Sequence, residues 1–301
     1  MAVGEARAKR HSIFRSLEPL LLQVNALDTR LVEIDKLRDM EFHLVRAELG
    51  PDEKLQFDPC YFEPLEASVF EKYPLAPYEE TNKLYDPLSY ERMLHEVLQE
   101  YPDEENQEEI AWELLDNLIM RSKHDDQSQL HYNLCNMVDH IDTHVCCDRV
   151  GIPGFDDFCS TLKELATMTI KGYYDVYPSK YNFNMWGSRC QLSQEWKLLR
   201  LYTEPSKNLP HAIATFKSYE LANDGTLTIA EIRGIVRWII RMHHRRQFRC
   251  TYDYQFLSIW YMGPKHGRII QSHHDGERMV VQYSPLMSFE DRGTAPTSLF
   301  V

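Results

Sequence analysis

The sequence has few cysteines, no long apolar run and no short catalytic signature. Its seven cysteines are an odd number scattered over 301 residues, whereas a secreted framework would be denser and even-numbered. Because no run of about 18 apolar residues is present, we expect no membrane span. The apolar cluster at 20–22 is too short for a signal-peptide core. These absences predict a soluble protein of the cytoplasm or nucleus.

The patterns that name a reaction are absent as well. The sequence contains no G-x-S-x-G, G-x-G-x-x-G, H-E-x-x-H or C-x-x-C pattern and no Walker phosphate loop. Their absence makes an enzyme less expected without excluding one, because many active sites have no short motif. We predict no cofactor.

The charge that is present is unevenly distributed. Residues 51–110 contain 17 acidic and 4 basic side chains, a balance equal to the net charge of −13 of the whole sequence. Residues 233–268 contain eight basic side chains and one acidic side chain, Asp253. The sequence is therefore acidic early and basic late.

Composition and periodicity divide the sequence into four regions. We expect an N-terminal amphipathic-helix region, an acidic strap rich in proline and aromatic residues, a helical body, and a β-meander with a tail. These regions span residues 1–50, 51–106, 107–250 and 251–301 respectively.

Apolar residues from Ile13 to Ile34 recur every three or four positions. This spacing is typical of an amphipathic helix packed on its own domain, and it also fits a coiled-coil partner. Because proline is well tolerated only in the first turn of a helix, Pro19 predicts a helix start near residues 16–19.

Helical patterns recur through the middle of the sequence. An aromatic-rich aperiodic segment, 173–186, is predicted to be a loop packed by its own side chains. The predicted helices span residues 88–100, 107–123, 127–148, 155–171, 191–202, 208–221 and 229–246.

After Arg249 the pattern becomes that of strands, with Asp275-Gly276 as a strong hairpin signal between two apolar runs. The predicted strands span residues 254–262, 268–272 and 278–283. The predicted fold is α+β: a mostly helical body with a short C-terminal three-stranded antiparallel β-meander.

Residues 216–232 look like a degenerate EF-hand. Asp224, Gly225 and Glu231 occupy the fifth, sixth and twelfth loop positions, but Ala222 at the third position supplies no ligand. The alternative is a turn followed by a helix that Thr228 and Glu231 cap reciprocally. Asp224 and Glu231 are therefore only weak metal candidates.

A second group of metal candidates lies on one predicted helix. His140, His144 and Cys147 fall on the same flank of its apolar face, and zinc could accept them with a fourth ligand from elsewhere. The alternative places them at the boundary of a buried helix. No metal is predicted from either group.

Arginines four residues apart form a stripe along the predicted helix 229–246. A row of guanidinium groups can hold a protein partner, the protein's own acidic segment 51–110, or, as a less favoured option, nucleic acid or a phosphate ligand. The predicted binding residues are Arg233, Arg237, Arg241, Arg245, Arg246 and Arg249.

The predicted hairpin contains candidates for acid–base chemistry. His266, His274 and Asp275 could act as general acids or bases. Asp275 is also explained as the turn residue before Gly276.

Residues 240–289 resemble a C-terminal module of filamentous-fungal proteins of unassigned function. The similar features are the arginine-rich helix end, the G-P-K-H-G-R sequence at Gly263–Arg268, and the hairpin that leads to Tyr283-Ser284. The resemblance implies a fungal origin and brings no activity with it.

Two hypotheses of function follow. The first is a non-enzymatic interaction or regulatory protein that uses its basic helix face and does not bind membranes. The second is an enzyme or accessory factor of fungal secondary metabolism. It would hold a small ligand near the aromatic loop 173–186 and the hairpin histidines.

Overall fold

The computed structural model divides the chain into two compact units, which are described separately. The first comprises residues 1–64 and 167–299, and the second comprises residues 65–166 and 300–301. The described residues are 3–51, 54–75, 90–100, 102, 106–124, 126–146, 148–152, 162, 169–170, 189–190, 193–194, 196–203, 211–244, 252–291 and 294–301. The predicted loop 173–186 and most of the predicted helix 155–171 lie outside these ranges.

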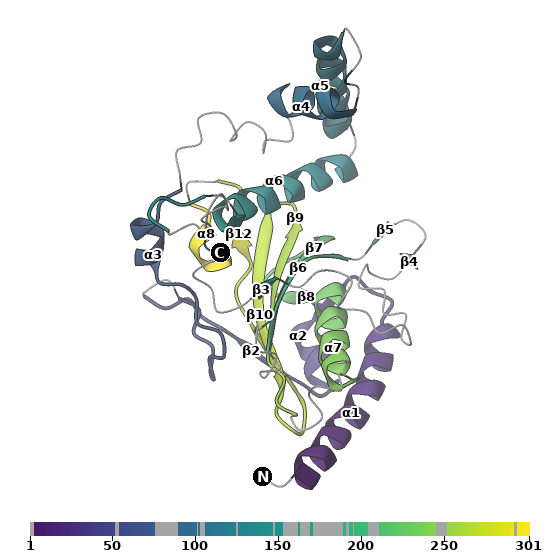
Figure 1. Cartoon of the computed structure of the whole chain (residues 1–301). Coiled ribbons are helices and arrows are strands. Elements are labelled where there is room, and N and C mark those ends of the chain that lie inside the picture. The colour runs from purple at the N-terminus through teal and green to yellow at the C-terminus, as the bar shows by residue number, and fades with distance from the viewer. Residues whose placement is uncertain are drawn as a thin grey trace. The chain divides into compact units, whose positions relative to one another are not determined.

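The first unit is built around an eight-stranded mixed sheet (Figure 1). Its strands run in the order β2-β11-β10-β9-β7-β6-β3, and β12 pairs with β10 beside this path. The strands are β2 (Phe42–Arg46), β3 (Thr169–Ile170), β6 (Trp196–Thr203), β7 (Ala212–Leu221), β9 (Phe256–Gly263), β10 (His266–His274), β11 (Met279–Tyr283) and β12 (Met287–Ser288). The pairs β7–β9 and β11–β2 are parallel, whereas the other pairs are antiparallel.

Helices and two smaller sheets complete the first unit. Helix α7 lies between the parallel strands β7 and β9 in the sequence, as a crossover connection requires. Strand β8 pairs antiparallel with β1, and β4 pairs with β5. These elements are α1 (Val3–Asn25), β1 (Leu31–Glu33), α2 (Ile34–Arg38), β4 (Arg189–Cys190), β5 (Ser193–Gln194), β8 (Thr226–Thr228) and α7 (Ile229–His244).

The second unit is helical in its described part. Met93, Val97, Ala111 and Leu115 form a small apolar cluster between α4 and α5. The predicted helices 88–100, 107–123 and 127–148 are confirmed here, with boundaries shifted by a few residues. The helices are α3 (Ala67–Lys72), α4 (Tyr90–Glu100), α5 (Gln107–His124) and α6 (Asp126–Cys146). Helix α8 (Thr297–Phe300) belongs to the first unit except for its last residue.

The prediction of a mostly helical body with a short three-stranded meander is wrong. Strands β9, β10 and β11 form the centre of a much larger mixed sheet. The predicted helices 191–202 and 208–221 contain the strands β6 and β7. Along β7 the alternation of apolar and polar residues changes phase between Phe216 and Tyr219, near the irregular register between Ser218 and Leu221. The resulting spacing of three residues also fits a helix.

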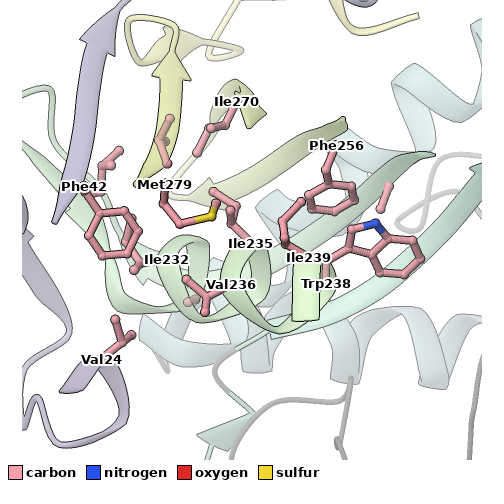
Figure 2. Close-up of a cluster of buried hydrophobic side chains, with 14 of the residues drawn as sticks. Val24, Phe42, Ile232, Ile235, Val236, Trp238, Ile239, Phe256, Ile270 and Met279 are labelled. Atoms are coloured by element: carbon pink, nitrogen blue, oxygen red, sulfur yellow. The ribbon is translucent and has the colours of Figure 1, made fainter. Parts of the chain in front are cut away.

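The main core lies between α7 and the sheet. Ile235 and Ile239 of α7 lie next to Met279 and Phe256 of the sheet, and Ile232 lies beside Phe42 (Figure 2). The predicted helix 229–246 is confirmed as α7. Its apolar residues recur every three or four positions, which places them on one side of the helix.

Gly234 allows α7 to approach β9 closely. A Cβ atom at this position would lie 2.9 Å from Cζ2 of Trp260, so a larger residue would force the indole or the helix to move. The Trp260 ring stacks in turn on Phe216 of β7, with ring centroids 4.4 Å apart.

Helix α1 is longer than its predicted start near residues 16–19. It begins at Val3 and carries Pro19 inside it. Proline removes one helical hydrogen bond. Burial of Ile13, Leu17, Leu20 and Val24 along one face offsets that loss, so the helix continues through the proline.

The sheet face opposite α7 is contacted by part of the predicted strap. Gln271 accepts a hydrogen bond from the Tyr61 amide at 2.8 Å and donates one to the Pro59 carbonyl at 2.7 Å. Gln282 accepts one from the Asp58 amide at 2.7 Å. Side-chain amides of the sheet therefore hold the backbone of this segment.

None of the helices in the described ranges is both long and apolar enough to cross a membrane.

Candidate functional site

The first two arginines of the predicted stripe contact the C-terminal end of α1. Arg233 is only 8 % exposed, and its Nη2 donates to the carbonyls of Asn25 and Leu27, both at 3.2 Å. Nη2 of Arg237 donates to Oδ1 of Asn25 at 3.4 Å, and its guanidinium lies 5.2 Å from the Trp196 ring centroid. Both cations lie at the helix end where carbonyl groups leave a partial negative charge.

The next arginine of the stripe is also inside the fold. Arg241 is 3 % exposed, and its guanidinium lies 5.8 Å from the ring centroid of Trp238. A partner in solution therefore reaches little of Arg233 or Arg241. Arg245, Arg246 and Arg249 lie outside the described residues, and their binding role stays a prediction.

The EF-hand-like segment is a strand, a turn, a short strand and a helix, so the incoming helix of an EF-hand is missing. The predicted capping box is confirmed. The Glu231 amide donates to Oγ1 of Thr228 at 3.1 Å, and the Thr228 amide donates to Oε2 of Glu231 at 2.6 Å. Asp224 accepts hydrogen bonds from the Leu286 amide at 2.6 Å and from Arg46 at 3.2 Å.

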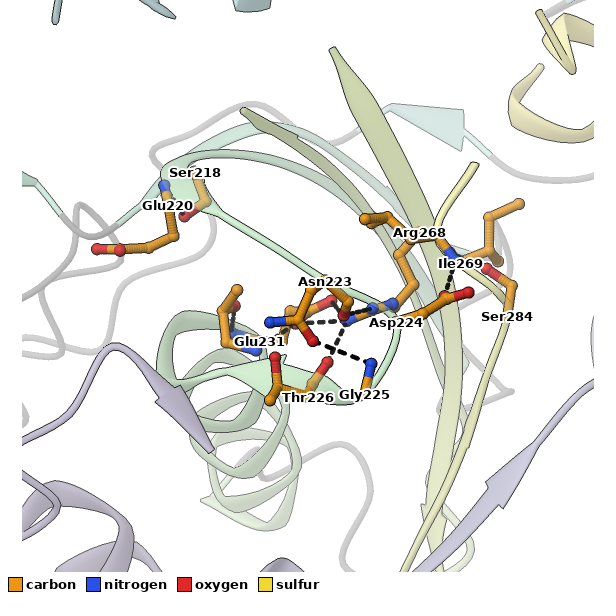
Figure 3. Close-up of polar contacts among 12 residues, drawn as sticks. Ser218, Glu220, Asn223, Asp224, Gly225, Thr226, Glu231, Arg268, Ile269 and Ser284 are labelled. Carbon is orange, nitrogen blue, oxygen red and sulfur yellow. Dashed lines mark hydrogen bonds and ion pairs between the residues drawn. The ribbon is translucent and has the colours of Figure 1, made fainter. Parts of the chain in front are cut away.

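The carboxylate of Glu231 is paired with an arginine that sequence analysis did not connect to it. Nη1 of Arg268 lies 3.2 and 3.1 Å from the two carboxylate oxygens, and both side chains are 0 % exposed (Figure 3). Arg268 also donates to the carbonyls of Thr226 at 3.1 Å and Asn223 at 2.8 Å. Because the partners are 37 residues apart, no local pattern predicts the pair.

His274 is held in its neutral form by two hydrogen bonds. Its Nδ1 accepts from the Gly276 amide at 3.0 Å, so its Nε2 carries the proton and donates to Oγ of Ser16 at 3.1 Å. The pKa of His274 is lowered to about 4, mainly by burial. The charges of His273 and Lys9 act in the same direction, and Asp275 opposes them. Both ring nitrogens are therefore occupied by contacts within the fold.

The other hairpin candidates do not join His274 in one site. Asp275 accepts hydrogen bonds from the amides of Glu277 at 2.7 Å and Arg278 at 2.9 Å, as a turn residue does. Partial burial alone would raise the pKa of Asp275, but these donors and nearby positive charges lower it. His266 lies at the opposite end of β10, about 25 Å away at the usual rise per strand residue.

The histidine pair of α6 is close together. The rings of His140 and His144 are 5.1 Å apart between centroids. The pKa of His144 is lowered to about 4, mainly by burial and in addition by the charges of His140 and Arg149. Cys147 lies outside the described residues, and among those that the structure does describe, no three His, Cys, Asp or Glu side chains are arranged to hold a metal ion.

A cationic cavity lies at the N-terminal end of α1. It has a volume of about 580 Å³ and lies between the first turns of α1 and the last turn of α7. The described residues that line it are Gly4, Arg7, Ala8, Arg10, His11, Phe14 and His243, none of which is acidic. The six residues from α1 recur at helical spacing on one face.

This cavity was not predicted from the sequence, because the helix was expected to start after residue 15. A signal was nevertheless present, since Arg7, Arg10, His11 and Phe14 are three, four and seven residues apart. Placed on a helix, they would have formed a basic and aromatic face.

The wall of the cavity is fixed by an aromatic cluster. Arg10 donates a hydrogen bond to the hydroxyl of Tyr254, whose ring meets His243 edge-on at 4.3 Å between centroids. Burial raises the pKa of Tyr254 to about 12 although Arg10 opposes this, so the phenol stays neutral. Lys9 lies 4.4 Å from the centroid of the Tyr252 ring nearby. The hydrogen bond to Tyr254 orients the Arg10 side chain at the wall of the cavity.

Comparisons of this chain with models of known protein families, with curated proteins and with solved structures gave no match.

Proposed function

We propose that this protein is a non-enzymatic binding protein that takes up a small anionic molecule in the cavity beside α1. The observation that carries the proposal is the cavity's composition. Arg7, Arg10, His11 and His243 line about 580 Å³, and no acidic side chain is found among the described residues of the lining. Small-molecule sites have volumes of about 300–1,000 Å³, so the cavity has a suitable size.

The electrostatics of the cavity favour an anion. Gly4 lines it, so the first turn of α1 brings the positive end of the helix dipole, about half a charge, to the cavity. The last turn of α7 contributes a partial negative charge of about the same size. The two dipole ends therefore roughly cancel. The two full positive charges of Arg7 and Arg10 outnumber the negative charge of Glu5, which is in the first turn of α1 but not among the described lining residues.

A small ligand fits the charge of the whole molecule better than a long polyanion does. The net charge of −13 repels nucleic acid at a distance. A small anion experiences mainly the nearby arginines, because screening removes most interactions beyond about 8 Å at physiological salt.

A binding role also agrees with the state of the hairpin histidine. A general acid or base needs a ring nitrogen within reach of a substrate. Those of His274 contact Ser16 and Gly276 instead. The regulatory consequence of binding would follow from α1, because the ligand contacts a helix that packs on α7.

Calorimetric titration of the full chain with inorganic phosphate and pyrophosphate tests the proposal. We expect binding that weakens as salt is raised. Arg7→Gln should lower the affinity about tenfold or more, because it removes a charge-assisted hydrogen-bond donor. Arg15→Gln is the matched control, since Arg15 is an exposed arginine of α1 outside the cavity lining. Absence of binding, or an equal loss in both variants, would overturn the proposal.

A further inference from the structure

The sheet face opposite α7 carries polar side chains that a segment of the chain covers. Gln271 of β10 and Gln282 of β11 are register partners, so their side chains stand side by side. Ile270 and Val281, their neighbours along the strands, belong to the core on the α7 side, so the glutamines project from the other face. Residues 58–62 lie over this face and are called the strap segment below.

The two glutamines bind the main chain of the strap segment. The side-chain amide of Gln271 bonds both the Tyr61 amide and the Pro59 carbonyl. Oε1 of Gln282 accepts a hydrogen bond from the Asp58 amide. Every residue other than proline carries both a backbone donor and a backbone acceptor. The glutamines therefore recognise backbone rather than a particular set of side chains.

Two aromatic side chains of the strap segment add contacts of their own. The Tyr61 ring meets the His273 ring edge-on, with centroids 5.1 Å apart. The Phe62 ring meets the His211 ring in the same way, at 6.2 Å between centroids. The side chains of residues 58–60 are exposed. Selectivity on this face therefore comes from two consecutive aromatic positions.

The strap segment leaves part of the hydrogen-bonding capacity of this face unused. Nε2 of Gln282, Nδ1 of His273 and Oε1 of Gln255 have no hydrogen-bond partner in the described part of the chain. The three side chains are only 1 %, 7 % and 2 % exposed. Gln282 bonds Asp58 of the segment, and the other two side chains contact Tyr61. Buried polar atoms without a partner destabilise a structure, so the segment is an imperfect occupant of this face.

The unused atoms also indicate what kind of occupant fits better. A second copy of this chain would bring the same segment and leave the same three atoms unpaired. A segment of different sequence can offer them donors and acceptors. It has to displace a tethered competitor, whose effective concentration is about millimolar, and the additional hydrogen bonds supply that advantage.

We propose that this sheet face is a binding site for a linear peptide segment of another protein, and that the strap segment is its built-in competitor. The main chain of the partner bonds Gln271 and Gln282. Two consecutive aromatic residues of the partner take the places of Tyr61 and Phe62. None of the side chains on this face lines the cavity beside α1, so the inference does not depend on the function proposed above.

Release of the strap segment makes the site measurable. Tyr61→Pro removes both the amide that Gln271 binds and the ring that His273 contacts. The probe, called the strap peptide, is a synthetic peptide of residues 56–63 with Cys60→Ser. Fluorescence polarisation should show at least about tenfold tighter binding to Tyr61→Pro than to the wild type, because the tethered segment competes only in the wild type. Tyr61→Ala, which removes only the ring, replaces Tyr61→Pro if thermal melting shows that the latter does not fold.

Matched variants test which groups are recognised. A strap peptide with an N-methylated Tyr61 amide keeps the ring but loses the donor, so it should bind about tenfold more weakly. Gln271→Leu in the Tyr61→Pro background should lose at least as much. Gln23→Leu in the same background is the control, because Gln23 is an exposed residue of α1, and it should leave peptide binding unchanged.

A selection tests whether another sequence fits better than the chain's own. Random octapeptides displayed on phage are selected on Tyr61→Pro. The selected peptides should carry two adjacent aromatic residues. The best of them should bind at least about tenfold more tightly than the strap peptide, because they pair polar atoms that the strap peptide leaves unpaired.

Each outcome decides one part of the inference. Absence of peptide binding to a folded release variant, or equal binding of the N-methylated peptide, would overturn the site. Selected peptides that bind no more tightly than the strap peptide would make the strap segment a purely structural element. A wild-type dimer in light scattering that Gln271→Leu dissociates would assign this face to exchange between two copies and overturn the assignment to another protein.

Discussion

Helix α1 meets arginines at both of its ends, but in opposite roles. At its C-terminal end, Arg233 and Arg237 come from α7 and contact α1 carbonyls and Asn25. At its N-terminal end, Arg7 and Arg10 come from α1 itself and line a cavity together with His243 of α7. Because α7 meets α1 at both ends, the two helices run antiparallel.

The difference between the ends follows from what each arginine contacts. At the carbonyl end, the backbone of α1 supplies acceptors, and the cations there stabilise the fold. At the amide end, the backbone offers only donors, which repel a guanidinium and attract an anion. The same residue type is therefore structural at one end of a helix and available to a ligand at the other.

Arg268 is a fully buried arginine with a structural role, and its removal should have the largest effect on stability. Arg268→Met should lower the free energy of unfolding by about 3–5 kcal/mol, because it leaves the carboxylate of Glu231 buried without its partner. Urea unfolding measures the effect. Arg268→Met combined with Glu231→Gln should cost less than the sum of the single changes. Strict additivity of the two would contradict the coupling.

Arg233 tests the carbonyl end of α1 directly. Arg233→Met should lower the free energy of unfolding by about 2 kcal/mol, because the carbonyls of Asn25 and Leu27 lose a charged donor. Arg7→Met, at the other end, should change stability by no more than about 0.5 kcal/mol. Chemical unfolding of both variants makes the comparison. Equal losses would show that the two ends do not differ as argued.

The contact of α1 with His274 should make stability depend on pH. The unfolded histidine takes up a proton below its ordinary pKa of about 6.5. The folded one does so only near pH 4, because its pKa is lowered to about 4. Stability is therefore complete above about pH 6.5 and falls as the pH is lowered toward 4.

Urea unfolding at pH 7 and pH 5 measures this contribution. The native chain should lose about 1–2 kcal/mol more than His274→Gln does over this interval. His144 titrates in both proteins, so its effect cancels in the difference. An identical pH dependence in the two proteins would exclude His274 as the cause.

The smallest expected effect comes from a substitution at the N-terminal end of α1 that changes no charge. Gly4→Ala should raise the free energy of unfolding by about 0.5 kcal/mol, because glycine costs helix stability and the added Cβ meets no neighbour. Thermal melting is sensitive enough to detect it. A clear loss of stability would mean that the surface at Gly4 is packed in solution.

The features predicted successfully from sequence depend on short-range physics. Helix α7 was predicted because Ile232, Val236 and Ile239 recur at helical spacing, and its start because Thr228 and Glu231 form a capping box. Such signals involve residues within one or two turns of each other.

The features that were missed depend on distant partners. The sequence patterns of β6 and β7 fit a helix, and these segments form strands because they pair with neighbouring strands of the sheet. Glu231 and Arg268 become a pair only after α7 crosses the sheet. The cavity was missed because Pro19 was assigned to a helix start, and the burial that carries α1 through the proline comes from tertiary packing.

The parallel pairing of β2 with β11 sets the order in which the sheet can form. Phe42 pairs with Met279, so residues near the two ends of the chain complete one side of the sheet. During synthesis β2 leaves the ribosome more than two hundred residues before β11, so it cannot form this pairing until β11 has been synthesised. Pairing across such a separation makes folding slow. A chain that stops before β11 would leave both β2 and the edge of β10 open to aggregation.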